Sequence, residues 1–383
     1  MRPRLFVAVA VVAAVAGIVC LDLRPVHAGQ QTMGSGYKVL EPIRHGSLTV
    51  FPVVAPKSYS TGEFLTLDEG LRSGDVVVTE YGNVRGLLRR QHTMPTMQHD
   101  KAEVNRLVLV NNSKRPLLLL AGEIVAGGKQ DRVIGKDRIV PAESDPVDLS
   151  VFCVEPGRWV ATSDRFGASG TTYGGGIGGG SGAAPGTLMA QPSVRAKAMG
   201  DKDQNQVWAE VRRQQSSMAL EVEAAAPRAS TEEIRSTSSY AHVMENKDVK
   251  EKVDEVARPI EQNYQSLIKQ LRDRKAVGVV VAVNGRIIWS DIFAGTELLE
   301  KYWPKLVRSY ASEAVVTRAK GGEASLAQAE AFLANMDGHR ETIESEPGIY
   351  RHTEINGDGF KAFALTSLLP KTGFDVHVAK MAD

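Results

Sequence analysis

The stretch that decides the fold is residues 276–293, "AVGVVVAVNGRIIWSDIF", in which Asn284 and Gly285 separate two runs rich in β-branched residues. Asn-Gly is the preferred pair for the two-residue turn of an antiparallel hairpin, because both positions take positive φ. The stretch therefore predicts a β-hairpin. A second hairpin is expected near the end of the chain, where "GIYRHTEI" and "FKAFALTS" flank the turn "NGDG" at residues 356–359.

Upstream of this hairpin the chain reads as a succession of short strands. Val- and Leu-rich runs separated by Gly, Pro, Asn and Ser are typical of an antiparallel sandwich or barrel. The runs are residues 47–55, 75–80, 105–112, 115–125 and 147–155. Two hairpins are predicted between them, one through "VNNSKRP", with positive φ at Asn111 and Asn112, and one through "VIGKDRIV", turning at residues 135–137.

The sequence pattern changes at residue 167 and again at residue 190. Residues 167–187 are dominated by glycine and predict a flexible loop. Residues 190–275 then show helical periodicity, interrupted at Pro259, and predict a mainly helical insertion. Further helices are expected at residues 296–315, capped by the Thr296 hydroxyl, and at 325–336. A β-rich half followed by helices and two hairpins indicates an α+β fold, expected as one domain over residues 37–380.

The N-terminus is expected to be a secretory signal peptide. Arg2 and Arg4 precede the apolar run of residues 5–21, and "VHA" at residues 26–28 supplies the small residues that signal peptidase reads. The apolar run is short for a membrane span. We therefore expect cleavage after Ala28 and export to the periplasm or the extracellular space, with a retained anchor as the alternative.

Cleavage would leave 43 basic and 44 acidic residues. This balance gives no global reason to bind nucleic acid or an anionic membrane, so any anion site must be local. Cys153 would be the only cysteine, which excludes an internal disulfide. Its apolar strand predicts a buried thiol with a raised pKa.

Catalytic signatures such as GxSxG, HExxH and CxxC are absent, so the sequence favours a protein without enzymatic activity and implies no cofactor. One loop offers soft ligands that suit Cu(I), and copper binding is kept as an alternative function. Its residues are His92, Met94, Met97 and His99. Packing or exposure of these side chains is the simpler interpretation, and no metal site is assigned.

The most polar stretch is residues 127–142, "GGKQDRVIGKDRIVPA". Folded as the predicted hairpin, it would gather four basic side chains, with Asp131 and Asp137 as their partners and the amides of Gly127 and Gly128 nearby. The basic residues are Lys129, Arg132, Lys136 and Arg138. The stretch is then either an anion site or a solvated turn of mutually paired charges.

The chain contains two specific motifs, "GEIVAGGKQDR" at residues 122–132 and "CVEPGRW" at residues 153–159. With them it resembles the ARG and rhodanese-phosphatase superfamily-associated protein domain. ARG stands for ADP-ribosylglycohydrolase. The resemblance runs from about residue 37 to the last hairpin. It implies no established activity, and the family's association with ADP-ribose and phosphate-handling enzymes implies a binding role. The residues it singles out are Glu123, Lys129, Gln130, Asp131, Arg132, Glu155, Arg158 and Trp159.

These residues support one binding hypothesis and one catalytic alternative. Lys129, Arg132 and Arg158 are expected to hold an anionic small molecule, with Trp159 as an aromatic wall and Asp131 orienting one arginine. The alternative is a hydrolase that uses carboxylates as acid and base, with or without a metal. Those carboxylates are Glu123, Asp131 and Glu155.

Overall fold

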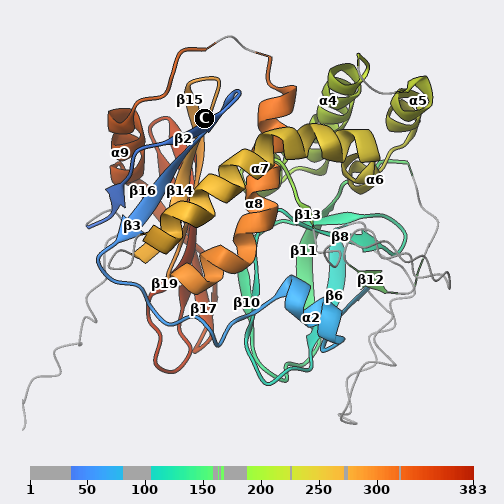
Figure 1. The fold of residues 1–383 in the computed structure, drawn as a ribbon. Coiled ribbons are helices and arrows are strands. Elements are labelled where there is room, and N and C mark those ends of the chain that lie inside the picture. The colour runs from blue at the N-terminus through green and yellow to red at the C-terminus, as the bar shows by residue number, and fades with distance from the viewer. Residues whose placement is uncertain are drawn as a thin grey trace, which may run out of the picture. The chain divides into compact units, whose positions relative to one another are not determined.

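The predicted hairpin around Asn284 and Gly285 lies at the centre of a nine-stranded antiparallel sheet (Figure 1). Its strands are β14 (Lys275–Val283) and β15 (Arg286–Phe293), and the turn residues have φ of 50° and 79°. This computed structural model describes residues 36–80, 105–157, 163, 165–167, 188–224, 227–270, 275–318 and 321–383. The residues Met33–Asp383 form one compact unit.

The large sheet has the order β1-β3-β14-β15-β19-β18-β17-β16, with β2 also paired to β3. Its remaining strands are β1 (Lys38–Val39), β2 (Ile43–His45), β3 (Leu48–Ala55), β16 (Gly338–Glu346), β17 (Tyr350–Gly357), β18 (Phe360–Ser367) and β19 (Asp375–Ala382). β3 and nearly all of β14 are buried, which explains their continuous apolar runs. The second predicted hairpin is confirmed as β17–β18.

The N-terminal strands form a closed barrel of six strands, in the order β12-β5-β6-β11-β9-β8 and back to β12. They are β5 (Val76–Glu80), β6 (Arg106–Asn111), β8 (Glu123–Gly127), β9 (Arg132–Ile134), β11 (Val147–Cys153) and β12 (Phe166–Gly167). A short strand, β13 (Leu188–Met189), pairs with β8 from outside the ring. Of the two predicted architectures, sandwich and barrel, the structure shows the barrel.

Three short strands form a wall between the barrel and the large sheet. They are β4 (Leu65–Thr66), β7 (Leu117–Leu119) and β10 (Arg138–Val140). Leu117 and Leu119 belong to the barrel core, whereas Leu118 belongs to the core of the large sheet. Because successive side chains of a strand point to opposite faces, β7 contributes to both cores. This double burial explains the unbroken leucine run of residues 117–120.

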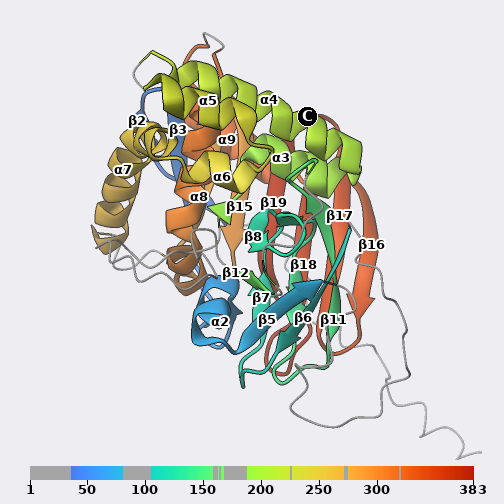
Figure 2. The same ribbon diagram turned by 90° about the vertical axis from the view of Figure 1, so that its right-hand side faces the viewer.

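Helices cover both faces of the large sheet. α7 (Lys247–Gln270) and α8 (Thr296–Val316) pack on the face toward the barrel wall, and α9 (Leu326–Ala334) packs on the other face (Figure 1). The barrel lies against the half of the sheet formed by β15 to β19 (Figure 2). The other helices are α2 (Leu67–Ser73), α3 (Pro192–Ala196), the π-helix η2 (Lys197–Asp201), α4 (Gln204–Val222), α5 (Arg228–Ser236) and α6 (Tyr240–Glu245).

Two predicted hairpins are wrong. The strands on either side of "VNNSKRP", β6 and β7, belong to different sheets, and so do β9 and β10 on either side of residues 135–137. In both cases the two strands that are neighbours in sequence pair with other strands and not with each other. Asn111 and Asn112 are not in the positive-φ region. Instead, the Asn111 side chain donates to the C=O groups of Arg115 (2.9 Å) and Pro141 (2.8 Å).

Two helix details also differ from the prediction. Pro259 lies inside α7, which runs on because its apolar face is buried, and the chain breaks at Asn246 between α6 and α7 instead. α8 begins after Gly295 with no side-chain cap, so Thr296 does not serve as the predicted cap. The helix predicted at residues 325–336 is confirmed as α9, and Ser325 caps it.

Several predictions concern residues outside the described ranges. They are the signal peptide of residues 1–28, the Met/His loop, the glycine-rich stretch after Gly167, Arg158 and Trp159.

Candidate functional site

Carboxylates hold the backbone of the loop that joins β8 to β9. The N–H of Lys129 donates to Oε1 of Glu80 (2.7 Å), and the N–H of Gly127 donates to Oδ1 of Asp131 (3.0 Å). The N–H of Asp131 donates to Oε2 of Glu155 (3.1 Å). Side chains from the ends of β5 and β11 therefore fix a turn that would otherwise be flexible. These amides bind the protein's own carboxylates, not an external anion.

The two glycines of this loop are required by close packing. Gly127 and Gly128 have φ of 123° and 53°, in the region that favours glycine. A Cβ on Gly128 would lie 2.3 Å from the Phe166 ring and 2.7 Å from Oε1 of Glu80. The N–H of Gly128 donates to the Ser163 hydroxyl (3.1 Å). The loop thus has little room to adopt another conformation.

Glu155 ties the segment after β11 to the same loop. Its backbone C=O accepts a hydrogen bond from Nε2 of Gln130 (3.0 Å). Oδ2 of Asp131 accepts one from the hydroxyl of Ser239, which caps α6 (2.7 Å). The structure therefore brings together most of the predicted site residues, namely Lys129, Gln130, Asp131, Arg132 and Glu155.

The residues of this group differ in exposure. Arg132 is fully buried, and Gln130, Asp131 and Glu155 are at most 7% exposed. Lys129 is partly exposed. Lys129 is therefore the most exposed residue of the group.

Glu123 does not belong to this group, because it begins β8 and the loop follows the other end of that strand. It is fully buried and forms an ion pair with Lys305 of α8, which also pairs with Asp68 (2.7 Å). Burial raises the pKa of Glu123. Burial alone would lower the pKa of Lys305, but Glu123 and Asp68 raise it. The catalytic alternative that grouped Glu123 with Asp131 and Glu155 is therefore not supported by their positions.

The other basic residues of the polar stretch also have different partners from those expected. Lys136 forms an ion pair with Glu344 on β16, and Arg138 lies 3.5 Å from Glu346 on the same strand. Asp137 contacts His377, not the neighbouring bases. Lys136, Arg138 and Asp137 therefore have partners outside the predicted cluster.

A second polar centre, here called the central ionic network, lies between the barrel and the large sheet. Nδ1 of His377 is 2.5 Å from Oδ2 of Asp137, and Nε2 of His377 is 3.1 Å from Oδ1 of Asp291. Arg195 of α3 donates to both carboxylate oxygens of Asp291 (2.9 Å each), and the Tyr310 hydroxyl also donates to Asp291. All five side chains are fully buried.

The charges of this network balance when His377 is protonated. Burial alone would lower the pKa of His377, but Asp137 and Asp291 raise it to about 9. Burial alone would raise the pKa of both aspartates, yet His377 lowers that of Asp137, and Arg195 and His377 hold that of Asp291 far below its usual range. Two positive and two negative charges therefore neutralise one another away from water. The network therefore joins α3, α8, β15, β19 and the β9–β10 loop without exposure to solvent.

The sequence carried a partial signal for this network. Asp291 in "IIWSDIF" and His377 in "FDVHVAK" interrupt apolar runs, and a charge in a buried strand needs a partner. Nothing in the sequence identifies Arg195 as a member of this network. Its side chain extends to Asp291 and passes close to Gly122. A Cβ on Gly122 would lie 2.6 Å from Cγ of Arg195.

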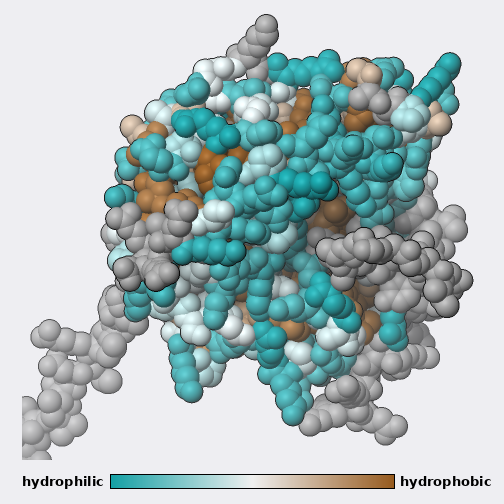
Figure 3. All heavy atoms as spheres, in the orientation of Figure 1, coloured by the Kyte–Doolittle hydropathy of each residue, from teal (hydrophilic) through white to brown (hydrophobic). Residues whose placement is uncertain are grey.

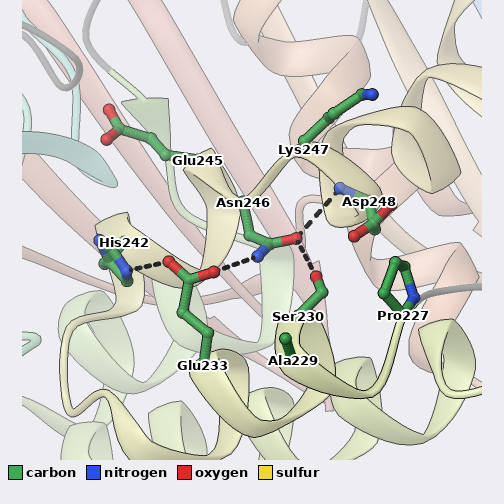
Figure 4. Close-up of a pocket in the computed structure, with 9 residues that line it drawn as sticks. All are labelled: Pro227, Ala229, Ser230, Glu233, His242, Glu245, Asn246, Lys247 and Asp248. Atoms are coloured by element: carbon green, nitrogen blue, oxygen red, sulfur yellow. Dashed lines mark hydrogen bonds and ion pairs between the residues drawn. The ribbon is translucent and has the colours of Figure 1, made fainter.

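A surface hollow of about 530 Å³ lies among α5, α6 and α7 (Figure 4). Glu233 accepts a hydrogen bond from Asn246 (3.0 Å) and lies 2.8 Å from Nε2 of His242. Both His242 and Glu233 are about half exposed. These polar groups already pair with one another, and they show no preference for a particular ligand.

The rest of the described surface offers few further candidates. The face in Figure 3 is largely hydrophilic, and the only large hydrophobic side chains exposed among the described residues are Leu220 and Leu368. Within the same ranges, no group of three or more His, Cys, Asp or Glu side chains is placed to hold a metal ion. Cys153 is buried, and burial raises the pKa of its thiol, as predicted.

The barrel, the nine-stranded sheet and the two polar centres define a mixed α+β protein. The model of the ARG and Rhodanese-Phosphatase-superfamily-associated Protein domain matches residues 36–380, and the chain belongs to this family. No curated protein and no solved structure matches the chain. Among the described helices, none is sufficiently long and apolar to cross a membrane.

Proposed function

We propose that this chain is a binding module that takes an anionic small molecule at the β8–β9 loop, with Lys129 as the first contact. The observation that carries the proposal is the fixed backbone of this loop, whose N–H groups are held by Glu80, Asp131 and Glu155. A preorganised loop lowers the entropic cost of binding. Arg158 and Trp159, which follow Glu155 in the sequence, remain part of the proposed site.

The charge of the loop is compatible with an anionic ligand. Each of the three carboxylates accepts a backbone N–H, and such hydrogen bonds stabilise the carboxylate charge locally. A lysine ammonium can then bind a phosphate or a carboxylate at the surface as a point charge. A binding role, unlike a catalytic one, also requires neither a nucleophile nor a general base.

A thermal melting screen tests this function. The melting temperature of the full chain should rise with phosphates, nucleotides or carboxylates, and Lys129→Ala should remove this rise while the unliganded protein stays folded. Lys38→Ala is the matched control, because it removes the same charge from an exposed position on β1. The proposal fails if no anion shifts the melting curve, or if the two variants respond alike.

We also propose that the protein is exported. The support is the sequence of residues 1–28, which combines basic residues, an apolar run and a small-residue cleavage motif. N-terminal sequencing of the protein from a secretion-competent host should find Gly29 as the first residue. An intact Met1 in the cytosolic fraction would contradict export.

A further inference from the structure

One row of side chains crosses four strands of the large sheet beneath the β9–β10 loop (residues 135–137). Glu344 of β16 pairs with His352 of β17, which pairs with Leu365 of β18, which pairs with His377 of β19. Directly paired residues point to the same face of a sheet, with strands about 4.8 Å apart. The two histidines therefore lie on one face with Leu365 between them.

Two consecutive residues of the loop contact this row at separate points. Lys136 forms an ion pair with Glu344, and Asp137 contacts His377. His352 lies between Glu344 and His377 in the row. The loop is thus fastened to the sheet on both sides of His352.

His352 differs from every other polar group in this row. It is 1% exposed, and neither ring nitrogen has a hydrogen-bond partner in the part of the chain that the structure describes. Its ring is stacked near that of Phe363, with centroids 6.0 Å apart. A neutral imidazole fits this apolar position better than a charged one, because a buried charge needs acceptors for both N–H groups.

We infer that His352 is an acid-sensitive latch: when it is protonated, it competes for the carboxylate of Glu344 and frees the Lys136 side of the β9–β10 loop from the large sheet, while Asp137 stays bound to His377. Protonation would give the ring two N–H donors in a buried position. The directly paired carboxylate is that of Glu344, which Lys136 now holds. Withdrawal of Glu344 from Lys136 removes one of the two fastenings of the loop.

Charged groups from several neighbouring segments act on His352. Burial, which has the largest effect, together with Lys136 and Lys202 lowers its pKa to about 4, against the opposing effects of Asp137 and Glu354. Each of these carboxylates already has a partner, since Glu354 pairs with Lys202 (2.7 Å) and Asp137 contacts His377. Beside the loop, Arg138 pairs with Glu346, and Glu344 also accepts the Tyr350 hydroxyl.

The direction of the effect follows from these pKa values. A released His352 would recover a pKa near 6.5, whereas in the closed loop its pKa is about 4. The released state therefore binds the proton more tightly. The Lys136 side of the loop stays fastened above pH 6.5 and is released progressively as the pH falls toward 4.

Hydrogen exchange of the full chain tests the latch. After correction for the intrinsic pH dependence of exchange, deuterium uptake of the peptide that covers the loop should rise on the order of tenfold or more between pH 6.5 and about 4. His352→Phe, which keeps the stacking on Phe363, should abolish that rise. His339→Phe is the control, because His339 is an exposed histidine on the neighbouring strand β16, and this variant should keep the rise.

Three outcomes would overturn the inference. The first is a wild-type loop whose uptake does not change, and the second is a rise that persists in His352→Phe. The third is a rise of equal size in the barrel peptides of β5 and β6, which would indicate global unfolding. His352→Gln, which is neutral and polar, serves in the same test if the phenylalanine variant does not fold.

Discussion

Single side chains join the two β units of this protein, and His377 makes the clearest contribution. It links Asp137 beside the barrel to Asp291 in the large sheet without contact with water. An imidazolium between two carboxylates is stable in a buried position because every charge has a partner. Its effect on stability should therefore depend on pH.

The unfolding free energy should reveal this dependence. His377 has a pKa of about 9 in the folded protein against 6.5 as its ordinary value, so the folded state binds the proton more tightly. The stabilisation is complete below pH 6.5 and is lost as the pH rises through about 9, a loss of roughly 3 kcal/mol. Urea denaturation at several pH values should show this loss in wild type and not in His377→Gln. Parallel pH profiles for the two proteins would refute the assignment.

The close packing around Gly128 makes the loop sensitive to an added side chain. Gly128→Ala should lower stability by about 2 kcal/mol or more beyond the backbone penalty, because the new Cβ would overlap the Phe166 ring. Gly46→Ala is the matched control. Its φ of 56° is close to the 53° of Gly128, but nothing lies within 4 Å of the added Cβ. Equal losses of denaturant stability in the two variants would contradict this packing argument.

Contacts between distant side chains are the part of the structure that the sequence predicts least. The polar residues of the β8–β9 loop could be found because they form one motif, and most of them do come together. Their partners, such as Glu80 and Ser239, come from distant segments and have no local signal. In the central ionic network, Asp291 and His377 interrupt apolar runs, but the sequence does not show which residues pair with them, because the members are spread from Asp137 to His377.

Elements were predicted well where local chemistry alone determines them. The β14–β15 hairpin follows from the turn preference of Asn284 and Gly285, and α9 follows from its apolar pattern. The failed hairpins at residues 110–116 and 135–137 have ordinary turn sequences. There the choice of partner strand depends on burial in two separate cores, which one sequence does not reveal.

The proline inside α7 shows how burial overrides local preference. Pro259 removes one helical hydrogen bond, yet the helix continues through buried residues such as Ala257, Ile260 and Tyr264. Pro259→Ala should restore the hydrogen bond and stabilise the protein, with about 3 kcal/mol as the upper limit. Thermal or urea unfolding measures the change. A less stable variant would show that the backbone around Pro259 is adapted to proline.

Strands from both sides of the glycine-rich stretch share the same sheets. β3 pairs with β14 along its full length, and β8 pairs with β13. The wall strand β7 places Leu118 in one core and Leu119 in the other. We therefore predict that the parts before and after residues 167–187 fold as one domain, as the family match over residues 36–380 suggests.

Limited proteolysis followed by size-exclusion chromatography under native conditions tests this central claim most directly. The glycine-rich sequence of residues 167–187 predicts cleavage there. The two fragments should then elute together at the position of the intact protein, because β3 remains paired with β14. Fragments that separate, and that each keep a folded circular dichroism spectrum, would show two independent domains and contradict the account.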